Sequence, residues 1–592
     1  MRSSENTALL PLIISGLLTT LIIISSIHSG VRESNRIINI SIILFTIWIV
    51  IFLSQLKMGY VIAKTKCQFF GKLIFTMIIS TFLVTAIWSS GYLTLNTGEA
   101  LINGTVHRDT LWQSTIAESI KIYGYSSHLM QDASFFAYHF GSNAIMALLS
   151  MIFNVSVFNT YNYLYPLIFI PLYAFLILSV IIEIKKNKNQ SAKLTVLDYI
   201  ILSSFFIGFL PSRLLSQLGI WKSSWVVSET FLIALVFFLI YVIIMLKLRV
   251  YKNDNSFKLP FYIITPIFII ICTLCKVSVG GLLAVAFVYL DLRMNYKKIS
   301  HWIMYGLLFL LFLFFYTMFS GPEGWGGIGS IRFLSFVRTH TKFGLAGFAW
   351  HYFFLLLFTL IVVFYQLSVN NPLKQALINK KLIFEETLII ITIVSIIPDM
   401  FLNIHGGSGV YFSYFQELIA IGLLLGYNIP DKLYEKIQTR SLINKTIFVL
   451  SILLLSLTML INSEPINALK MSKPFYAIRF ITGIEKRHEK ENTFLSNIYS
   501  IAMIPQYEKK HYGIFINDDA EVWDLLISDV SWYNHRVLLF YPALTGIRIL
   551  NYKSIDGDSI SINLNESLEV ARENNLRFVI HFFNDTYEII KL

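Results

Sequence analysis

Three consecutive ionisable residues, His107, Arg108 and Asp109, lie in a polar stretch, residues 95–136, that follows the third apolar segment of the chain. A charged group held beside a bilayer is costly and usually has a use. A carboxylate there can act as a general base toward a hydroxyl, because burial raises its pKa while a neighbouring cation keeps it ionised. Asp109 is therefore the candidate base, with His107 and Arg108 as that cation or as phosphate ligands. Two other acids in this stretch compete for the role: Glu99 and Asp132.

An amphipathic helix is expected from Asp109 onward, since apolar residues recur at helical spacing in DTLWQSTIAESIKIYG. Its apolar side includes Leu111 and Ile116, and its polar side includes Glu118 and Lys121. We expect this helix to lie along the membrane interface, with its N-terminal residue facing the lipid head groups. The alternative is a solvated loop helix that Asp109 only caps, since aspartate is a favoured N-cap.

Cationic residues in other segments could bind an anionic ligand. Lys276 separates two apolar runs, where it either marks a helix end as a snorkelling lysine or holds an anion. Arg332 and Arg338 follow the glycine-rich segment GPEGWGGIGS, so this stretch is either a loop that orders over an anionic substrate or an ordinary exposed loop. His405 lies in the turn NIHGGSG, where a lone histidine beside glycines is more often a turn residue than a ligand.

The composition indicates that a membrane surrounds the elements that position these residues. The chain has 592 residues, 55% hydrophobic and 14% charged, with a mean hydropathy of +0.65, which excludes one large soluble core. Apolar runs of about 17 to 23 residues, long enough as helices to cross a hydrocarbon core of about 30 Å, recur along residues 1–462. We count about thirteen or fourteen and expect a polytopic α-helical membrane domain. The first, residues 8–27, lacks the cleavage site of a secretory signal and is expected to be an anchor.

The net charge of +12 is distributed as in a membrane protein rather than a nucleic-acid-binding protein. Most Lys and Arg lie in short loops between apolar runs, as the positive-inside bias predicts, so these loops are expected in the cytoplasm and residues 95–136 outside. Successive loops must alternate between the cytoplasm and the outside. All the basic loops fall in the cytoplasm only if one apolar run does not cross the membrane. Residues 137–153 are the candidate for that short or re-entrant helix. The alternative is that the basic loop beginning at Lys185 lies outside.

A turn at the outer surface is expected near Lys276, because residues 260–292 are too long for one span and are flanked by basic residues. Cys272 and Cys275, two of the three cysteines, lie in this run without a second ligand pair. Packing is therefore a better interpretation than zinc binding. No metal follows from the cysteines and no cofactor is required by the sequence, while the involvement of a divalent metal is left open.

The segment 463–592 is polar, mixed in charge and free of long apolar runs. Short β-rich runs alternate there with helical patterns, which predicts a small α/β domain. Because the segment follows the last apolar run, it is expected outside the cytoplasm. The expected strands are residues 512–516, 537–541, 547–550 and 578–583, and the expected helices are residues 522–527 and 568–573.

The layout resembles the GT-C class of integral membrane glycosyltransferases: a loop with Asp109 after an early span, interfacial helices, and then a helix that opens with Tyr138 and His139. Members of that class have many spans, often a soluble domain after the last one, and polyprenyl-phosphate-linked sugar donors. The resemblance implies Asp109 as catalytic base and Tyr138 and His139 as substrate contacts. It makes Lys276 a candidate for the lipid phosphate by charge and place. Two departures leave the exact family open: Thr110 follows Asp109 where an Asp-Glu pair is familiar, and two extra spans precede the loop.

The predicted function is transfer of a sugar from a polyprenyl-phosphate-linked donor to an extracytoplasmic glycan or lipid acceptor, with inversion implied by the resemblance. The alternatives are a transporter or flippase of lipid-linked saccharide and a polymerase of polysaccharide repeat units. A transporter would place ionisable groups within spans and show two similar halves, and the sequence shows no such halves. The expected partners are donor, acceptor and membrane lipids. Frequent Ile, Lys and Asn without eukaryotic targeting marks favour a bacterial inner membrane.

Overall fold

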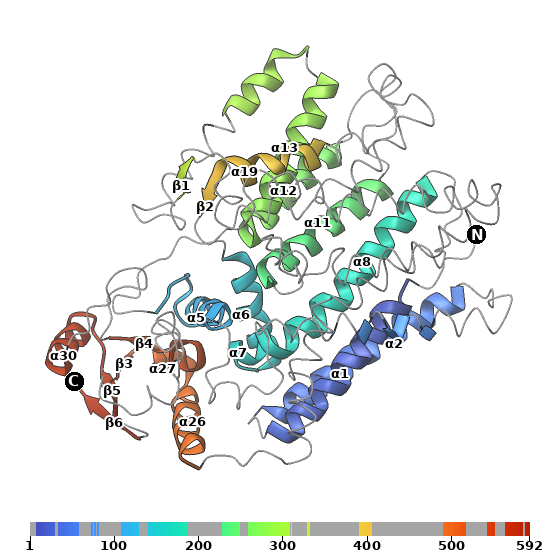
Figure 1. Ribbon diagram of the computed structural model, residues 1–592. Coiled ribbons are helices and arrows are strands. Elements are labelled where there is room, and N and C mark those ends of the chain that lie inside the picture. Colours follow the sequence, from blue (N-terminus) through green and yellow to red (C-terminus); the bar gives the residue numbers. More distant parts are fainter. Residues whose placement is uncertain are drawn as a thin grey trace, which may run out of the picture. The chain divides into compact units, whose positions relative to one another are not determined.

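The structure, a computed structural model, describes part of the chain (Figure 1). The described residues are 7–29, 33–58, 73–74, 76–78, 80–81, 84, 108–129, 140–187, 228–248, 259–295, 297–307, 310, 328–331, 390–404, 489–516, 541–550, 563–583 and 586–592. Contacts between residues divide the chain into two compact units. The first unit comprises residues 1–15, 47–86 and 169–470, and the second comprises residues 16–46, 87–168 and 471–592. The second unit thus contains both the polar stretch 95–136 and the polar C-terminal segment.

Long apolar helices confirm that the chain is a polytopic α-helical membrane protein. By length and composition, four described segments could cross a membrane: Leu9–Ile27, Ser34–Gln55, Val157–Lys186 and Glu229–Lys247. Each lies within a few residues of an apolar run expected from the sequence. The helices that contain these segments include α1 (Leu9–Ser29), α2 (Ser34–Met58), α8 (Tyr165–Asn187) and α11 (Glu229–Lys247).

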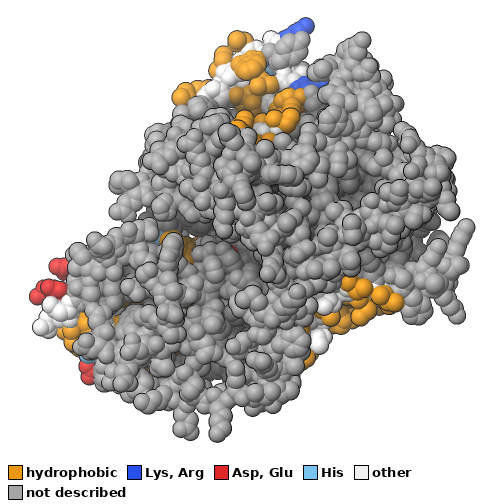
Figure 2. Space-filling model, viewed as in Figure 1, with side chains coloured by type: hydrophobic (Ala, Val, Ile, Leu, Met, Phe, Trp, Pro, Cys, Tyr) orange, Lys and Arg blue, Asp and Glu red, His pale blue; other side chains and the backbone are white. Residues whose placement is uncertain are grey.

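Exposed apolar side chains lie on single faces of these helices. Ile43 and Ile47 are exposed on α2, and Ile263 and Ile267 are exposed on α12 (Leu259–Cys275). Residues four apart share one face of a helix. Figure 2 shows hydrophobic side chains on the surface of the described helices. Apolar stripes of this kind suit lipid better than water.

Lys276 forms the turn of a helical hairpin, as predicted. The helix α12 ends at Cys275, and α13 (Val277–Asn295) begins immediately after Lys276. The two helices pack closely, and Gly280 permits this: an added Cβ there would lie 2.0 Å from Thr273 Oγ1. Both arms are short, as the length of the apolar run required.

The helix after the polar stretch, α6 (Gly141–Phe153), has 13 residues. That length corresponds to about 20 Å, whereas the hydrocarbon core is about 30 Å thick. The finding fits the short helix expected at residues 137–153. The helix ends at Asn154, which has a left-handed φ of 52°. The following helical segments are α7 (Val157–Asn159), the π-helical turn η1 (Thr160–Leu164) and α8.

The C-terminal part contains a small α/β fold, as predicted. One sheet has the order β4-β3-β5-β6, in which β3 is parallel to β4 and β5, and β6 is antiparallel to β5. The strands are β3 (Tyr512–Ile516), β4 (Arg548–Ile549), β5 (Phe578–Phe583) and β6 (Thr586–Lys591). The helices are α26 (Glu489–Ala502), α27 (Gln506–Lys509) and α30 (Leu564–Glu573). Two expected elements, residues 522–527 and residues 537–540, lie outside the described residues.

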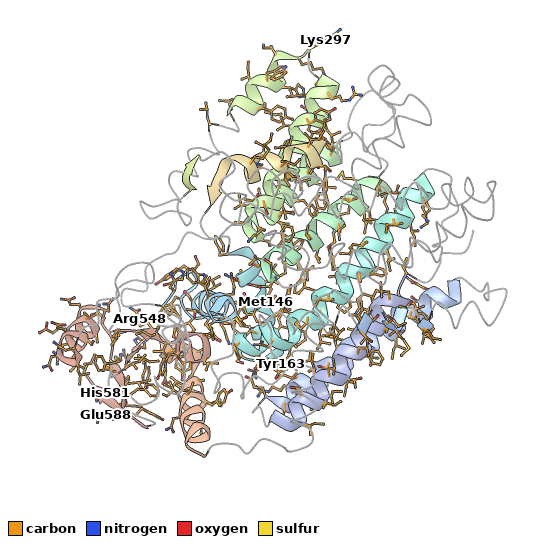
Figure 3. All side chains as sticks on the ribbon, in the orientation of Figure 1. Met146, Tyr163, Lys297, Arg548, His581 and Glu588 are labelled. Atoms are coloured by element: carbon orange, nitrogen blue, oxygen red, sulfur yellow. The ribbon has the colours of Figure 1, made fainter. Side chains whose placement is uncertain are left out.

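The two faces of this sheet bury different side chains. Val579 of β5 packs with Ala571 of α30 on one face, whereas Ile580 belongs to a cluster on the other face. This alternation is the period of two expected of a strand. Across β5 and β6, His581 Nδ1 lies 3.0 Å from Glu588 Oε1 (Figure 3).

A second, two-stranded sheet lies in the first unit. It pairs β1 (Ile328–Ile331) antiparallel to β2 (Leu402–Ile404), and the short helix α19 (Ile396–Phe401) precedes β2. The pairing joins the end of the glycine-rich segment to the start of NIHGGSG, two loops that each carry candidate cations.

Candidate functional site

Asp109 is the second residue of α5 (Arg108–Tyr123), so the helix predicted from this position is confirmed. The structure describes the backbone of Arg108 and Asp109, and the side chains of both lie outside the described part. Six other candidate residues from the sequence have neither backbone nor side chain in the described part: His107, Tyr138, His139, Arg332, Arg338 and His405. The geometry of the candidate site is therefore given by the contacts that hold helix α5 in place.

The helix α5 is buried on its polar side as well as its apolar side, so it is not the solvated loop helix of the alternative interpretation. Ile116 is buried, and so are Gln113, Ser114 and Glu118, the last with 3% of its surface exposed. A solvated helix keeps its polar face in water. Here, neighbouring parts of the second unit cover that face.

The apolar side of α5 packs on the C-terminal sheet. Leu111 belongs to one buried cluster with Ile514 of β3 and Ile580 of β5, and Trp112 packs against the same cluster. Phe158, at the start of the long apolar helix, is also a member. The helix that carries Asp109 is therefore part of the hydrophobic core that the C-terminal domain forms.

Two hydrogen bonds fasten the C-terminal end of α5 to this domain. The Nε2 of Gln506 donates to the backbone oxygen of Lys121 at 2.5 Å. The backbone N–H of Ile549 donates to the oxygen of Leu129 at 2.9 Å. Because β4 is an edge strand, the second bond extends the sheet toward the segment that follows α5.

A glycine turn of the C-terminal domain lies directly against α5. Gly546 has a φ of 72°, and an added Cβ would lie 2.3 Å from Ile122 Cδ1 and 3.2 Å from Glu118 Oε2. Thr545 Oγ1 accepts a hydrogen bond from the N–H of Ile547 at 3.1 Å, which holds the turn. Both the backbone conformation and the close approach favour a residue without a side chain.

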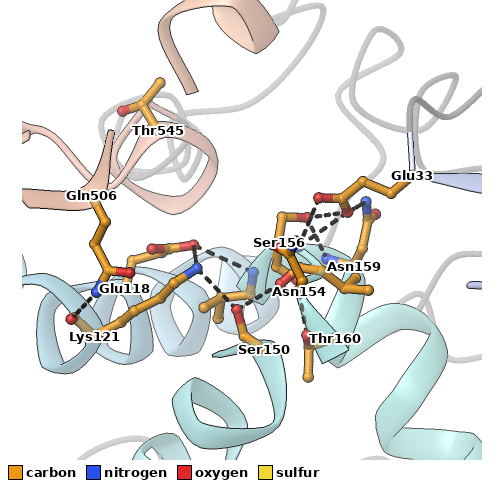
Figure 4. Close-up of polar contacts among 12 residues, drawn as sticks. Glu33, Glu118, Lys121, Ser150, Asn154, Ser156, Asn159, Thr160, Gln506 and Thr545 are labelled. Carbon is orange, nitrogen blue, oxygen red and sulfur yellow. Dashed lines mark hydrogen bonds and ion pairs between the residues drawn. The ribbon is translucent and has the colours of Figure 1, made fainter. Parts of the chain in front are cut away.

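Glu118 is the polar centre of these contacts (Figure 4). Its Oε1 accepts a hydrogen bond from the N–H of Val157 at 3.3 Å and lies 3.9 Å from Lys121 Nζ. Lys121 Nζ in turn donates to Ser150 Oγ of α6 at 3.0 Å. Lys509 of α27 is 8% exposed, and burial lowers its pKa, while Glu118 raises it and Lys121 lowers it again. One carboxylate and two ammonium groups thus share a buried environment.

Arg548 places a further cation against α5. Its Cζ lies 5.5 Å from the ring centroid of Tyr123, and its Nη1 donates to Asn574 Oδ1 at 3.2 Å. Burial raises the pKa of Tyr123, although Arg548 opposes the shift. The phenol therefore stays neutral at physiological pH, and the guanidinium packs over a neutral aromatic ring.

Glu33, between α1 and α2, caps the start of the long apolar helix. Its carboxylate accepts hydrogen bonds from the N–H of Ser156 at 2.9 Å and from Asn159 Nδ2 at 2.7 Å. Nearby, Arg36 Nη1 donates to the oxygen of Asn154 at 2.8 Å. Acidic groups at a helix N-terminus are favoured by the helix dipole.

The C-terminal domain also reaches this cap. Burial raises the pKa of Tyr499 in α26, and Tyr163 and Glu33 raise it further. Tyr499 also packs against the buried cluster that contains Phe158, at the start of the long apolar helix. The α1–α2 loop, the turn before Val157, α5 and the C-terminal domain are thus neighbours within one unit.

Lys276 belongs to the first unit, where it is 8% exposed in the turn between α12 and α13. Its backbone N–H donates to the oxygen of Cys272 at 2.7 Å. A snorkelling lysine would extend its ammonium into water. The burial of Lys276 is therefore poorly consistent with a snorkelling lysine. The role of Lys276 as an anion ligand remains a prediction.

A second buried acid lies in the first unit. Asp291 of α13 accepts hydrogen bonds from Tyr262 Oη at 2.6 Å and Asn295 Nδ2 at 2.9 Å, and His301 Nδ1 lies 2.5 Å from its other oxygen. The side chain of Asp291 is fully buried. These partners satisfy the carboxylate, as a buried charge requires.

Sequence analysis gave Glu118 only as a polar residue of the amphipathic helix and did not single out Glu33 or Lys509. Glu33 carried a detectable signal, because it is an acid between two apolar helices with Arg36 three residues later. Lys509 carried none, since the run EKKHYG reads as a solvated loop in a polar domain.

Within the described residues, no group of three or more His, Cys, Asp or Glu side chains could hold a metal ion. Cys272 and Cys275 are buried and not joined in a disulfide, which agrees with a packing role.

No protein-family model matches the sequence, and no curated protein matches it. Solved structures of an oligosaccharyltransferase from Archaeoglobus fulgidus are similar. One shows AglB in complex with an inhibitory peptide and a dolichol-phosphate, with 13% identity, a TM-score of 0.35, and coverage of 86% of this chain and 70% of that chain. The apo form has 12% identity and a TM-score of 0.37, with coverage of 87% and 70%. A form tethered to an acceptor peptide with the NVT sequon has 12% identity and a TM-score of 0.36, with coverage of 87% and 69%.

AglB is a GT-C glycosyltransferase, the class that the sequence resembles. Because each TM-score is below 0.5, the likeness carries no argument about the chemistry of this chain. Its function has to be argued from its own residues.

Proposed function

We propose that this chain is a membrane glycosyltransferase of the GT-C type that uses a polyprenyl-phosphate-linked sugar donor and an extracytoplasmic glycan or lipid acceptor. One observation carries the proposal. The helix that bears Asp109 packs on the C-terminal sheet, and its Glu118 is hydrogen-bonded to Val157, where the apolar helix Val157–Lys186 begins. Asp109 thus lies on a helix held where an apolar segment meets a polar domain. A lipid-linked sugar presents its reacting carbon at such a boundary.

In the proposed reaction, Asp109 removes the proton from an acceptor hydroxyl. The acceptor oxygen attacks the anomeric carbon, and the bond from that carbon to the phosphate oxygen breaks. The polyprenyl phosphate leaves with the bonding electrons, and a single displacement inverts the anomeric centre. Cations must neutralise the departing phosphate. Arg108 and His107, which adjoin Asp109 in the sequence, are the candidates for that role, while Lys276, Arg332 and Arg338 belong to the first unit and are candidates from the sequence alone.

Tyr138, His139 and His405 are proposed as further substrate contacts. Tyr138 and His139 stand shortly before α6 in the sequence, and α6 packs against α5. His405 directly follows β2, and Arg332 directly follows β1.

The sidedness of the proposal is supported by the contacts of Glu33. Glu33, between α1 and α2, bonds to the turn before Val157, and Tyr499 of the C-terminal domain packs against the cluster that contains Phe158. The end of α2 and the loop after it carry Lys57, Lys64 and Lys66 and are assigned to the cytoplasm by the positive-inside bias. The opposite end of α2, and with it the C-terminal domain, is then extracytoplasmic.

A transporter of lipid-linked saccharide is the second candidate, and Asp291 is the observation that favours it. Its buried carboxylate beside His301 has the composition of a proton relay, a common device in transporters. A polymerase of repeat units would use the same outer surface as the transferase and differs in its acceptor.

Detergent-solubilised protein separates the classes, because transfer needs no compartments and transport does. Purified protein would be incubated with a panel of undecaprenyl-phosphate monosaccharides and with envelope lipid and glycan extracts as acceptors. Release of free undecaprenyl phosphate together with a labelled product is the expected result. Donors that stay intact in detergent but are flipped in proteoliposomes would overturn the transferase in favour of the transporter. A ladder of products from lipid-linked oligosaccharides would indicate the polymerase.

A further inference from the structure

We propose that Gly546 and Glu118 are positioning residues, through which the C-terminal domain sets the location of Asp109. The inference rests on the proposed function, since it takes Asp109 as the base. Three features of the second unit support it.

The first feature is the absence of free space between the domain and α5. An added Cβ at Gly546 would lie 2.3 Å from Ile122 Cδ1, well inside van der Waals contact. The turn itself is held by Thr545, which donates to the oxygen of Tyr541 at 2.7 Å and accepts from Ile547. The turn is therefore in direct contact with the Ile122 side chain of α5, and a larger residue at position 546 must displace that side chain or the helix.

The second feature is the buried carboxylate of Glu118. One oxygen accepts from the N–H of Val157, and the other, which faces Gly546, has no hydrogen-bond partner among the described residues. Lys121 and Lys509 supply the compensating charge. Glu118 is therefore held between the membrane helix and the C-terminal domain and cannot move without losing contact with one of them.

The third feature is the stiffness of the connection to Asp109. Glu118 lies nine residues after Asp109 on the same helix, a separation of about 14 Å along the axis. A helix moves as a unit, so a displacement at Gly546 is carried to its first turn. Misplacement of a catalytic group by about 1 Å can cost about 10²-fold in rate.

The key variant is Gly546→Ala, and Gly124→Ala is its matched control. Gly124 also has a left-handed φ, 82°, but an added Cβ there meets nothing within 4 Å. Both variants place an alanine at a left-handed φ. Only Gly546→Ala also adds a methyl group in contact with a side chain of α5. We expect Gly546→Ala to lower kcat by about 10- to 100-fold with the KM for donor unchanged. Gly124→Ala should lower kcat much less.

Rescue distinguishes positioning from a general loss of folding. Ile122→Ala removes the side chain that the new methyl group would strike, so the double variant Ile122→Ala/Gly546→Ala should recover most of the lost kcat. Glu118→Gln should also lower kcat while the acid limb of the pH profile stays in place. Loss of that limb would instead make Glu118 the base and overturn its positioning role.

Amide hydrogen exchange of residues 108–116 reads the position of α5 without any assay of transfer. Gly546→Ala should speed exchange there, Ile122→Ala should reverse it, and Gly124→Ala should leave it near wild type. If the variants show this pattern of exchange but the wild-type protein transfers no sugar, the proposed function fails. The contact by which the Gly546 turn positions α5 is then still supported. If transfer is normal in Gly546→Ala, or its loss is not rescued by Ile122→Ala, the positioning role is overturned and the proposed function stands.

Discussion

The hydroxyl of Ser156 donates a hydrogen bond to the carboxylate of Glu33 at 3.0 Å, and the Ser156 backbone N–H binds the same carboxylate. These residues are 123 positions apart in the chain. The bond fastens the α1–α2 loop to the start of the apolar helix Val157–Lys186. The connection therefore ties the α1–α2 pair to the start of that helix.

Glu33→Ala should destabilise the second unit. The substitution removes the acceptor of several donors from Ser156 and Asn159, and the unsatisfied groups should lower the free energy of unfolding by about 1–3 kcal/mol. Denaturant unfolding in detergent measures the change. As a control, Glu183→Ala removes only an ion pair to the half-exposed Lys186 and should cost about 0.5 kcal/mol or less. Equal losses in the two variants would contradict the capping role.

Because Lys509 is buried, we expect the protein to become more stable as the pH rises above neutral. Burial holds the pKa of Lys509 below its ordinary range, so the unfolded chain binds this proton more tightly than the folded chain. The free energy of unfolding should therefore increase as pH rises through the folded-state pKa toward the ordinary lysine value of about 10.4. Lys509→Met should remove this increase.

The control for that prediction is Lys510→Met, because Lys510 is exposed beside Lys509. It should keep the wild-type pH dependence. The comparison belongs below about pH 10, the ordinary tyrosine value, above which buried Tyr123 and Tyr499 act in the opposite direction because burial raises each pKa. Parallel curves for Lys509→Met and the wild type would show that Lys509 is not buried as described.

The hairpin turn at Lys276 could be predicted from sequence because basic flanks and run length are local signals. The strand β6 was missed for an equally local reason: Ile589 and Ile590 are adjacent, which breaks the alternation that marks a strand. The helix α5 was predicted, but its burial was not. Gln506, which binds Lys121, is 385 residues away, and no sequence period reports a contact at that distance.

Some candidate residues of the site could be found from the sequence, and others could not. Asp109 was found because charge beside an apolar run is conspicuous in the sequence. Glu118 was placed only on the polar side of the helix, because its partner Val157 contributes only a backbone N–H, which every residue except proline carries. Residue types can therefore indicate the chemistry of this site, while the contacts that hold it are visible only in the fold.

Gly280→Ala should force α12 and α13 apart. The added Cβ would lie 2.0 Å from Thr273 Oγ1 and 2.5 Å from the Thr273 backbone nitrogen, so the backbone itself must shift. Overpacking of this kind costs about 1–3 kcal/mol. Thermal unfolding in detergent should show a clear loss for Gly280→Ala and little change for Gly306→Ala, whose added Cβ meets nothing within 4 Å. A matching loss at Gly306 would mean that any added methyl group is harmful.

Asp291→Asn tests whether the buried acid of the first unit is structural. The change weakens the hydrogen bonds to Tyr262 and His301, and a buried group left without its partner costs about 1–3 kcal/mol. The protein should lose stability, while sugar transfer per folded molecule should be retained. A variant that folds normally but loses sugar transfer would give Asp291 a role in the reaction rather than in stability.

The most direct test of the central claim is a single-turnover measurement on Asp109→Asn with a radiolabelled polyprenyl-phosphate sugar, alongside Glu99→Gln and Asp132→Asn. Loss of a general base typically costs about 10²- to 10⁴-fold in rate. The account predicts a loss of that size in Asp109→Asn with donor binding retained, and near-normal turnover in the two controls. Full turnover in Asp109→Asn would contradict it.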